Sequence, residues 1–476
     1  MTAALARSEI MTDDERAAAD VERAMARNDE LINRDLIRQW LLWGFFWTML
    51  APTVGVIIST KFNYPEFFGT HAWSTFGRLR PLHVNGVVWG AFSTLFIGLA
   101  YYVTPRLCGV RVWRERWGFA VVWIWNLNLA AAFVGIAGFG LNRGWEAGEL
   151  PLPCVLVLTA CVMAISLQLL MTIARRVQRD LYVSLWYLIG ALVWTDINLL
   201  LLIIGPYGTV PGVNNAALHG LFLHYVVGLW ITPAGYVLIY YFLPAATRAP
   251  IYSHKLSLIG FWSLAFFYPF VGIHHYLYSP IADWAETIAI VSSMMLIVPV
   301  WTVLQNFFGT MTGRWRDLGA NLPAKFLIVG AVLYLIGCFQ GSVEALRSLQ
   351  QPTHFTDFVV GHSHLTVFGT FVMWAIAGAV YVWPRVTRST SQVSSSFRLA
   401  NTGFWLIVLG IGGMTLVLTA QGLQQGYMLI AQADWMDSVN AIRPYWWLRT
   451  LTGITMDVGI SLVVLTLVRG SLTRPA

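Results

Sequence analysis

The side chains with the clearest chemical potential are His362 and His364, in the segment DFVVGHSHLTVFG at residues 357–369. This segment opens a long apolar run, residues 358–382, which we predict to be a membrane-spanning helix. Because successive helical residues turn by about 100°, the two imidazoles point roughly 200° apart. They cannot bind one metal ion together, but each can reach a separate site on either side of the helix. Ionisable groups within a membrane are rare and usually functional, although hydrogen bonds to neighbouring helices would also satisfy them.

A second candidate cluster lies in the sequence YPFVGIHH, residues 268–275. The adjacent His274 and His275 differ by about 100° in direction, so both can bind one ion if a third ligand comes from elsewhere. His224, in the preceding apolar segment, is the natural third ligand. Three imidazoles with an open position suit copper, zinc or non-haem iron, and these residues do not choose among the metals. Tyr268 lies seven residues before His275, on nearly the same face of an α-helix, although an ordinary packed tyrosine would look the same.

The elements that must hold these histidines are membrane-spanning helices. Of the 476 residues, 57% are hydrophobic and only 11% are charged, whereas a soluble domain carries about 25% charged residues. Apolar segments long enough to span a bilayer recur twelve times, at residues 37–60, 81–104, 117–140, 153–174, 182–205, 216–243, 256–278, 286–308, 326–346, 358–382, 400–423 and 446–468. The predicted fold class is therefore all-α, a polytopic membrane bundle of about 12 transmembrane helices.

The loops between these segments alternate in charge, which predicts the orientation of the chain. One set holds most of the basic residues: Arg106, Arg111, Arg114, Arg116, Arg175, Arg176, Arg179, Arg248, Lys255, Arg314, Arg316, Lys325, Arg385, Arg388, Arg398, Arg469 and Arg474. The other set holds only Lys61, Arg78, Arg80, Arg143, Arg347 and Arg443. By the positive-inside rule the first set is cytosolic, together with both termini. The net charge of +7 therefore reflects membrane orientation and does not indicate nucleic acid as a partner.

No linker or repeat divides the chain. We predict a cytosolic N-terminal tail at residues 1–36, one twelve-helix transmembrane catalytic domain at 37–468 and a short cytosolic C-terminus at 469–476. The first 36 residues are polar, so we expect no cleavable signal peptide. The four cysteines are scattered without a CxxC or CxxCH pattern, so covalent haem attachment, a thiolate metal cluster and a disulfide framework have no support.

The predicted topology gives each histidine a depth in the membrane. Six of the ten lie in four predicted helices and share the outer third of the bilayer: His83, His224, His274, His275, His362 and His364. Nothing in composition or helix packing requires this coincidence, and convergent imidazoles at one depth are what metal and haem ligation produces. The other four are expected to be solvated or interfacial: His71, His219, His254 and His354.

Several motifs together resemble one known family. They are RLRPLH at residues 78–83, His224 followed by Gly228 and by YYFLP at 240–244, YPFVGIHH, and GHSH at 361–364. With this spacing, nearly the whole chain resembles the catalytic subunit of the haem–copper oxidases, in particular the C-type (cbb3-type) branch. The resemblance implies the haem–copper oxidase subunit I fold, two b-type haems and one copper ion.

The resemblance also assigns the haem ligands. His83 and His364 would be the axial ligands of a low-spin haem b, and His362 would be the proximal ligand of a high-spin haem. This assignment agrees with the divergence of the last two histidines along their helix.

The copper facing the high-spin haem would be held by His224, His274 and His275. In the C-type branch the tyrosine that matches Tyr268 is linked covalently to a copper-ligand histidine, here His224. It would be the catalytic residue that supplies an electron and a proton when O₂ is split.

The branch takes protons from the cytosol by a single pathway, to which Thr232, Tyr240 and Ser257 correspond. Hydroxyl groups suit such a path because they both donate and accept hydrogen bonds. Gln340 departs from the family, since it stands where C-type enzymes have a glutamate implicated in proton conduction. Glutamine cannot change its charge, and Glu344, one turn further on, is a hypothetical substitute.

Three residues on the outer side resemble family residues more loosely. Glu146, in the sequence GWEAGE, resembles a glutamate that binds calcium beside the haem propionates. Arg80 and Arg449 would pair with those propionates, because arginine binds carboxylates as a two-pronged donor.

These features predict the catalytic subunit of a terminal oxidase in the bacterial inner membrane, with O₂ as substrate and electrons delivered by partner subunits that carry c-type haems. Nitric oxide reductases of the same superfamily place a glutamate four residues after the first copper-ligand histidine and lack the tyrosine. Gly228 and Tyr268 therefore favour O₂ reduction. A nitric oxide reductase with non-haem iron is the first alternative, and a transporter or haem-binding sensor without redox turnover is the second.

Overall fold

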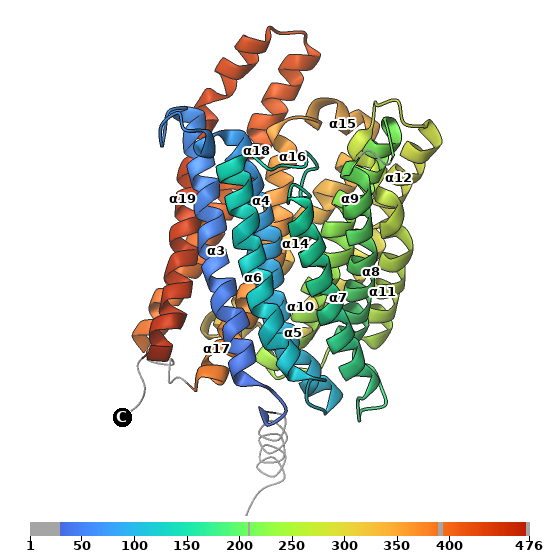
Figure 1. Cartoon of the computed structure of the whole chain (residues 1–476), viewed down its shortest axis with the longest axis vertical. Helices are drawn as coiled ribbons and strands as arrows, with labels where there is room; N and C mark the ends of the chain where they lie inside the picture. The colour runs from blue at the N-terminus through green and yellow to red at the C-terminus, as the bar shows by residue number, and fades with distance from the viewer. Residues whose placement is uncertain (1–28, 208–209, 389–393, 473–476) are drawn as a thin grey trace, which may run out of the picture.

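The computed structural model describes residues 29–207, 210–388 and 394–472. Within these residues twelve helices are long and apolar enough to cross a membrane, and no residue lies in a β-strand. The helices stand side by side in one bundle, and the first begins at the same end at which the last finishes (Figure 1). The predicted all-α class is confirmed. Most of the predicted N-terminal tail, and the last four residues, lie outside the described residues.

Every predicted segment overlaps one of the twelve spans. In chain order these are α3 (Arg34–Asn63); α4, η2 and α5 as one continuous helix (Phe76–Cys108); α6 (Glu115–Phe139); α7 (Leu152–Ala174); α8 (Val183–Ile204); α9, η4 and α10 (Val213–Thr247); α11 and η5 (His254–Tyr276); α12 (Asp283–Met295) with α13 (Ile297–Thr310); α14 (Leu322–Glu344); α16, η7 and α17 (Asp357–Thr387); α18 (Ser394–Ile430); and α19 (Trp435–Leu472). A short helix, α15 (Arg347–Thr353), precedes the tenth span.

Three of the spans form the inside of the bundle. The most apolar stretch of the second span is 100% buried, and those of the sixth and tenth spans are 89% buried. In the other nine spans only 39–50% of the corresponding stretch is buried. A helix that is apolar all round and buried all round is an inner helix. The second, sixth and tenth spans are therefore the core around which the others pack, and each of them carries one or two of the six histidines.

Each inner span changes from α-helical to π-helical winding close to its histidine. The π-helical segments are η2 (Gly86–Ser93), which begins three residues after His83; η4 (Val226–Ile231), which begins two residues after His224; and η7 (His364–Val372), which begins at a histidine. Such segments are rare and are frequently found at functional sites. The α-helical spacing predicted for these spans does not indicate them.

The seventh span also departs from α geometry at its histidines. Residues 268–276 (η5) are wound as a 3₁₀-helix, with three residues per turn. Pro269 lacks a backbone N–H and so cannot continue the α-helical hydrogen bonding of α11. The prediction that Tyr268 and His275 share one α-helical face is therefore wrong in its geometry, although Tyr268 still meets His224, as described below.

Side-chain caps fix where key helices begin. The Oγ of Thr356 accepts from the backbone N–H of Phe358, which starts α16 six residues before His362. Asn33, Ser253 and Asn321 cap α3, α11 and α14 in the same way.

The last two helices are longer than the membrane requires. Helices α18 and α19 contain 37 and 38 residues, whereas about 20 residues span a bilayer, so each is roughly 25 Å longer than necessary. Their shared hairpin rises beyond the other helices (Figure 1). Predicted spans of 400–423 and 446–468 were shorter because hydropathy detects only the apolar part of such helices.

Candidate metal centre

Five of the six histidines of the predicted layer form two groups in the structure, and the sixth is His362. The ring centres of His83 and His364 lie 5.9 Å apart, and their planes are only 19° from parallel. The Nδ1 of His83 lies 2.8 Å from the carbonyl oxygen of Ala51, and the Nδ1 of His364 lies 2.8 Å from that of Val360. A carbonyl only accepts, so each ring donates through Nδ1 and keeps a lone pair on Nε2.

The separation of this pair fits a haem iron held by two histidines. Two imidazoles on opposite sides of one iron, each at a metal–nitrogen distance of about 2 Å, would place their ring centres roughly 6 Å apart. Both tautomers are already set by the backbone carbonyls. Gly55 leaves the space that His83 needs, because a Cβ at that glycine would lie 2.7 Å from the imidazole ring.

The second group consists of His224, His274 and His275. Their ring centres are 4.6–4.9 Å apart, and one ligand nitrogen from each lies within 4.8 Å of the others. It is the only grouping of three or more potential metal-ligating side chains with such spacing in the described part of the chain. The Nε2 atoms of His224 and His274 are 2.8 Å apart, and the buried Nδ1 of His224 has no hydrogen-bond partner. Converging imidazole nitrogens, one of them without a partner, fit a copper ion well.

Tyr268 packs against this triad. Its ring centre lies 5.2 Å from that of His224, at an interplanar angle of 61°. The ring lies directly on the backbone of Gly228 in η4, where an added Cβ would be only 1.5 Å from the tyrosine Cε1. The tyrosine can occupy this place only because residue 228 has no side chain. Its predicted covalent link to His224 stays a prediction.

His362 lies on the tenth span, two residues before His364. It is close enough to His224 and His274 to interact with them electrostatically. Its Nδ1 lies 3.3 Å from the Oε1 of Gln340 on α14. A metal-ligating histidine usually donates its second N–H to such an acceptor, so the arrangement suits a proximal haem ligand whose partner is an amide and not a carboxylate.

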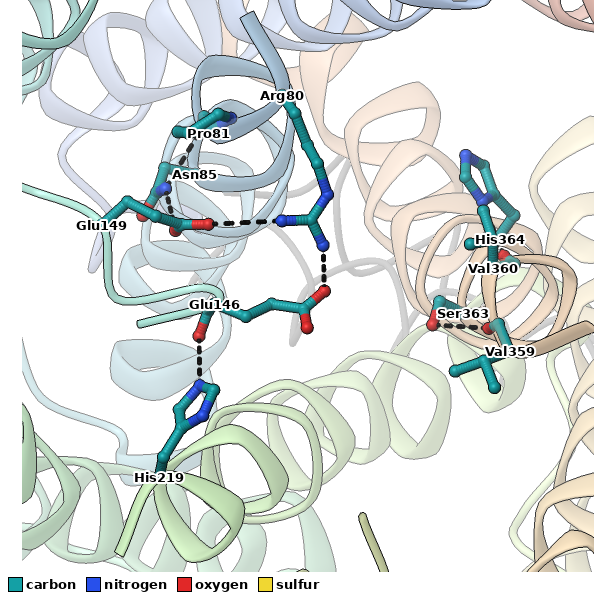
Figure 2. Close-up of polar contacts among 10 residues, drawn as sticks. All are labelled: Arg80, Pro81, Asn85, Glu146, Glu149, His219, Val359, Val360, Ser363 and His364. Atoms are coloured by element: carbon teal, nitrogen blue, oxygen red, sulfur yellow. Dashed lines mark hydrogen bonds and ion pairs between the residues drawn. The ribbon is translucent and has the colours of Figure 1, made fainter. Parts of the chain in front are cut away.

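Charged groups cluster at the end of the bundle that we predict to be outer. Arg80 forms ion pairs with Glu146 and, at 3.9 Å, with Glu149, and the amide of Asn85 donates to Glu149 at 2.8 Å (Figure 2). Glu149 is only 3% exposed, and its burial raises the pKa of the carboxyl group to about 7. The sequence analysis named Glu146 but missed Glu149, although the motif GWEAGE contains both. His219, expected to be interfacial, donates to or accepts from the hydroxyl of Tyr276 at 2.6 Å.

Arg449 also has a carboxylate partner within the chain. It lies 3.2 Å from Asp357, the first residue of α16, and that aspartate also accepts from the side-chain amide of Gln421. The guanidinium stacks over Phe62 at 4.7 Å. Both arginines predicted to meet haem propionates thus bind carboxylates of the chain itself, and their pairing with propionates stays a prediction.

Two of the predicted proton-path residues, Tyr240 and Ser257, belong to a buried polar cluster. The amide of Asn306 on α13 donates to the Oγ of Ser257 at 2.8 Å and to the hydroxyl of Tyr240 at 3.3 Å, and so links the two. Thr232 donates to the carbonyl of Val227, at the π-helical segment. Asn306 was missed by the sequence analysis because its partners are about 50 and 65 residues away along the chain.

Comparisons with known proteins cover nearly the whole chain. The family model described as "Cytochrome C and Quinol oxidase polypeptide I" matches residues 35–455. The "Cbb3-type cytochrome c oxidase subunit CcoN1" of Stutzerimonas stutzeri is 27% identical over 440 residues, which cover 89% of this chain and 92% of that protein. A "Cytochrome c oxidase subunit 1 homolog" of Agrobacterium tumefaciens is 28% identical and covers 88% of this chain and 80% of its own length. A haem–copper terminal oxidase dimer solved by cryo-EM has a similar fold, with a TM-score of 0.76 at 15% identity over 93% of this chain and 84% of that one.

Proposed function

The chain belongs to the cytochrome c and quinol oxidase polypeptide I family, the subunit I family of the haem–copper oxidases, and from this premise we propose that it is the catalytic subunit of a respiratory cbb3-type cytochrome c oxidase that reduces O₂ to water. The observation that carries the proposal is the convergence of His224, His274 and His275 beside Tyr268, with His362 close enough to interact electrostatically with His224.

The six histidines take three roles in this proposal. His83 and His364 hold a low-spin haem b, His362 is the proximal ligand of a high-spin haem, and the triad holds copper. The bound haem iron and copper supply the O₂-binding site and the electrons. The chain fixes their ligands: the carbonyls of Ala51 and Val360 orient the first pair, and Gln340 orients His362.

Tyr268 supplies a proton, and an electron when O₂ is split. Its position supports O₂ reduction over nitric oxide reduction for a steric reason. A side chain at residue 228 would start 1.5 Å from the tyrosine ring, so the glutamate of a nitric oxide reductase and this tyrosine cannot both be present. The chain has the glycine and the tyrosine.

Proton uptake from the cytosol is assigned to the cluster of Ser257, Asn306 and Tyr240, and to Thr232, which interacts with the catalytic tyrosine. Ser257 lies in the first turn of α11, at the predicted cytosolic end, and is fully buried. The hydroxyls can pass a proton by accepting on one side and donating on the other. Gln340 is not expected to carry a proton, and Glu344, also buried, is proposed to replace it.

Calcium is proposed to bind at Glu146, with Glu149 as a second carboxylate close by. Oxygen ligands suit this ion. Arg80 occupies the same carboxylates in the structure, so calcium would have to share them with this arginine or displace it. Arg80 and Arg449 are proposed to pair with haem propionates.

The protein is a multi-pass membrane protein. We assign it to the bacterial inner membrane with both termini cytosolic, because basic residues concentrate in one alternating set of loops. Its electrons would come from partner subunits with c-type haems, since the chain carries no CxxCH motif.

Metal analysis and spectroscopy of the purified complex test the proposal. We expect two haems b per chain, one of which binds carbon monoxide, one copper, and consumption of O₂. Non-haem iron in place of copper, with consumption of NO but not O₂, would identify a nitric oxide reductase. The lack of any haem that binds carbon monoxide would refute both enzymes and favour a transporter or sensor.

A further inference from the structure

One residue outside the histidine motifs contacts the triad directly. Ser293 lies on α12 and is only 1% exposed. Its Oγ is 2.7 Å from the Nδ1 of His274 and 2.6 Å from the backbone carbonyl oxygen of Ala289. The imidazole is thus joined, through one hydroxyl, to the backbone of a helix that carries none of the six histidines.

The donor of each bond follows from the count of hydrogens. A serine hydroxyl has one hydrogen, and a carbonyl oxygen can only accept, so Ser293 must donate to Ala289. Toward His274 the hydroxyl therefore accepts, and the hydrogen in that bond belongs to Nδ1 of the imidazole. The neutral ring then carries its lone pair on Nε2.

That lone pair points into the triad. The Nε2 of His274 lies 2.8 Å from the Nε2 of His224. A hydrogen on the Nδ1 of His274 leaves its Nε2 as the nitrogen available to a metal ion, which is the tautomer that ligation needs. His224 differs in this respect. Because the Nε2 of His274 accepts, the Nε2 of His224 must donate across this contact, and the lone pair of His224 lies on its buried Nδ1, which has no hydrogen-bond partner.

We propose that Ser293 is a positioning residue of the metal centre, which sets the tautomer and ring orientation of His274 and thereby the affinity of the triad for its metal. The inference rests on the proposed function only for the identity of that metal as copper. Outer hydrogen-bond partners of this kind typically account for a 10- to 100-fold difference in metal affinity.

A purely structural role must be distinguished, because serine in a helix often bonds to the carbonyl four residues earlier without further purpose. The neighbouring Ser292 provides a matched control. It is buried to a similar degree, at 6% exposure, lies on the same helix, and makes no hydrogen bond to a histidine in the structure. The substitutions Ser293→Thr and Ser293→Val form a second matched pair, because the two new side chains have the same shape and differ in the hydroxyl.

The experiment measures copper retention in the purified complex against a competing chelator, with the reduced haem spectrum as the check of folding. We expect Ser293→Ala and Ser293→Val to bind copper about 10- to 100-fold more weakly than wild type, while Ser292→Ala and Ser293→Thr remain close to it. The infrared C–O stretch of carbon monoxide bound to the cuprous ion should move to higher wavenumber in the first two variants, because a poorly oriented imidazole donates less charge to the metal.

Equal copper retention and equal C–O stretches in Ser293→Val and Ser293→Thr would overturn the inference, even if Ser293→Ala failed to assemble. Failure of the proposed function is a separate result. In that case the wild-type complex would hold iron, or no metal, at the triad of His224, His274 and His275. If that metal is iron, the same chelator series applied to iron still decides whether Ser293 acts on His274.

Discussion

We expect Gly228→Ala to abolish most O₂ reduction while leaving the low-spin haem in place. The added Cβ would lie 1.5 Å from Cε1 and 1.7 Å from Cζ of Tyr268, whereas carbon atoms in contact are about 3.5–4.0 Å apart. The tyrosine ring would therefore have to retreat by about 2 Å. It is 8% exposed and packed against His224, so little room exists for this movement.

The size of the effect follows from that displacement. A misplacement of about 1 Å in a reacting group costs around 100-fold in rate, so we expect turnover to fall by at least that factor. The cost in stability is smaller. Overpacking lowers the free energy of unfolding by about 1–3 kcal/mol, and the higher helix propensity of alanine raises it by up to about 1 kcal/mol. The complex should therefore still assemble.

The assay is steady-state O₂ consumption by the purified complex, normalised to its haem content. Gly412→Ala is the matched control, because a Cβ at that helical glycine has nothing within 4 Å and should leave turnover unchanged. Tyr268→Phe, which keeps the ring and removes the hydroxyl, should lose turnover with both haems intact. If Gly228→Ala kept the turnover of wild type, the steric argument would be refuted. The reason to prefer O₂ reduction over NO reduction would fall with it.

Four further predictions address the proton path, the hydrogen-bond partner of His362 and the outer carboxylates. Asn306→Leu should slow turnover at least 10-fold without changing the carbon monoxide spectrum, because it separates Ser257 from Tyr240; an unchanged rate would remove Asn306 from the proton path. Gln340→Glu should lower the reduction potential of the high-spin haem, since a carboxylate accepts more strongly from the Nδ1 of His362, and a spectroelectrochemical titration that gives the same potential would contradict this pairing. The pKa of Glu149 is raised to about 7, so the folded protein binds this proton more tightly than the unfolded chain, and the associated stability is lost as pH rises from about 4.5 to 7. The melting temperature of Glu149→Gln should therefore depend less on pH than that of wild type between pH 5 and pH 8. Parallel pH profiles of the two proteins would argue against a buried, protonated carboxyl. Removal of calcium with EGTA should lower the melting temperature of wild type but not of Glu146→Gln, and equal responses would contradict calcium binding at this carboxylate.

The helical architecture could be predicted because hydrophobicity and loop charge are local properties of the sequence. Apolar runs predicted twelve spans, and the described residues contain twelve helices long and apolar enough to cross a membrane. His83 and His364 were predicted to share a depth, and the structure places their ring centres 5.9 Å apart. The depth of a side chain in the membrane can be predicted from its position in the sequence when each helix crosses the membrane once.

What could not be predicted depends on contacts between distant segments or on departures from regular winding. Ser293 and Asn306 lie in ordinary apolar helices, and only packing shows that each reaches a functional side chain. The 3₁₀ winding at residues 268–276 changed the geometry expected for Tyr268, although the proline in YPFVGIHH was a visible signal. The π-helical segments left no comparable mark, because their residues are as apolar as those of any inner helix.

The inner position of the histidine-bearing helices has a consequence for how the chain is made. His364 follows His83 by about 280 residues, so at roughly 5–20 residues per second the ribosome needs about 15–55 s to supply the second after the first. During that interval the tenth span, which is part of the buried core, has not yet been synthesised. The pair of His83 and His364 therefore cannot form before ten of the twelve spans have been made.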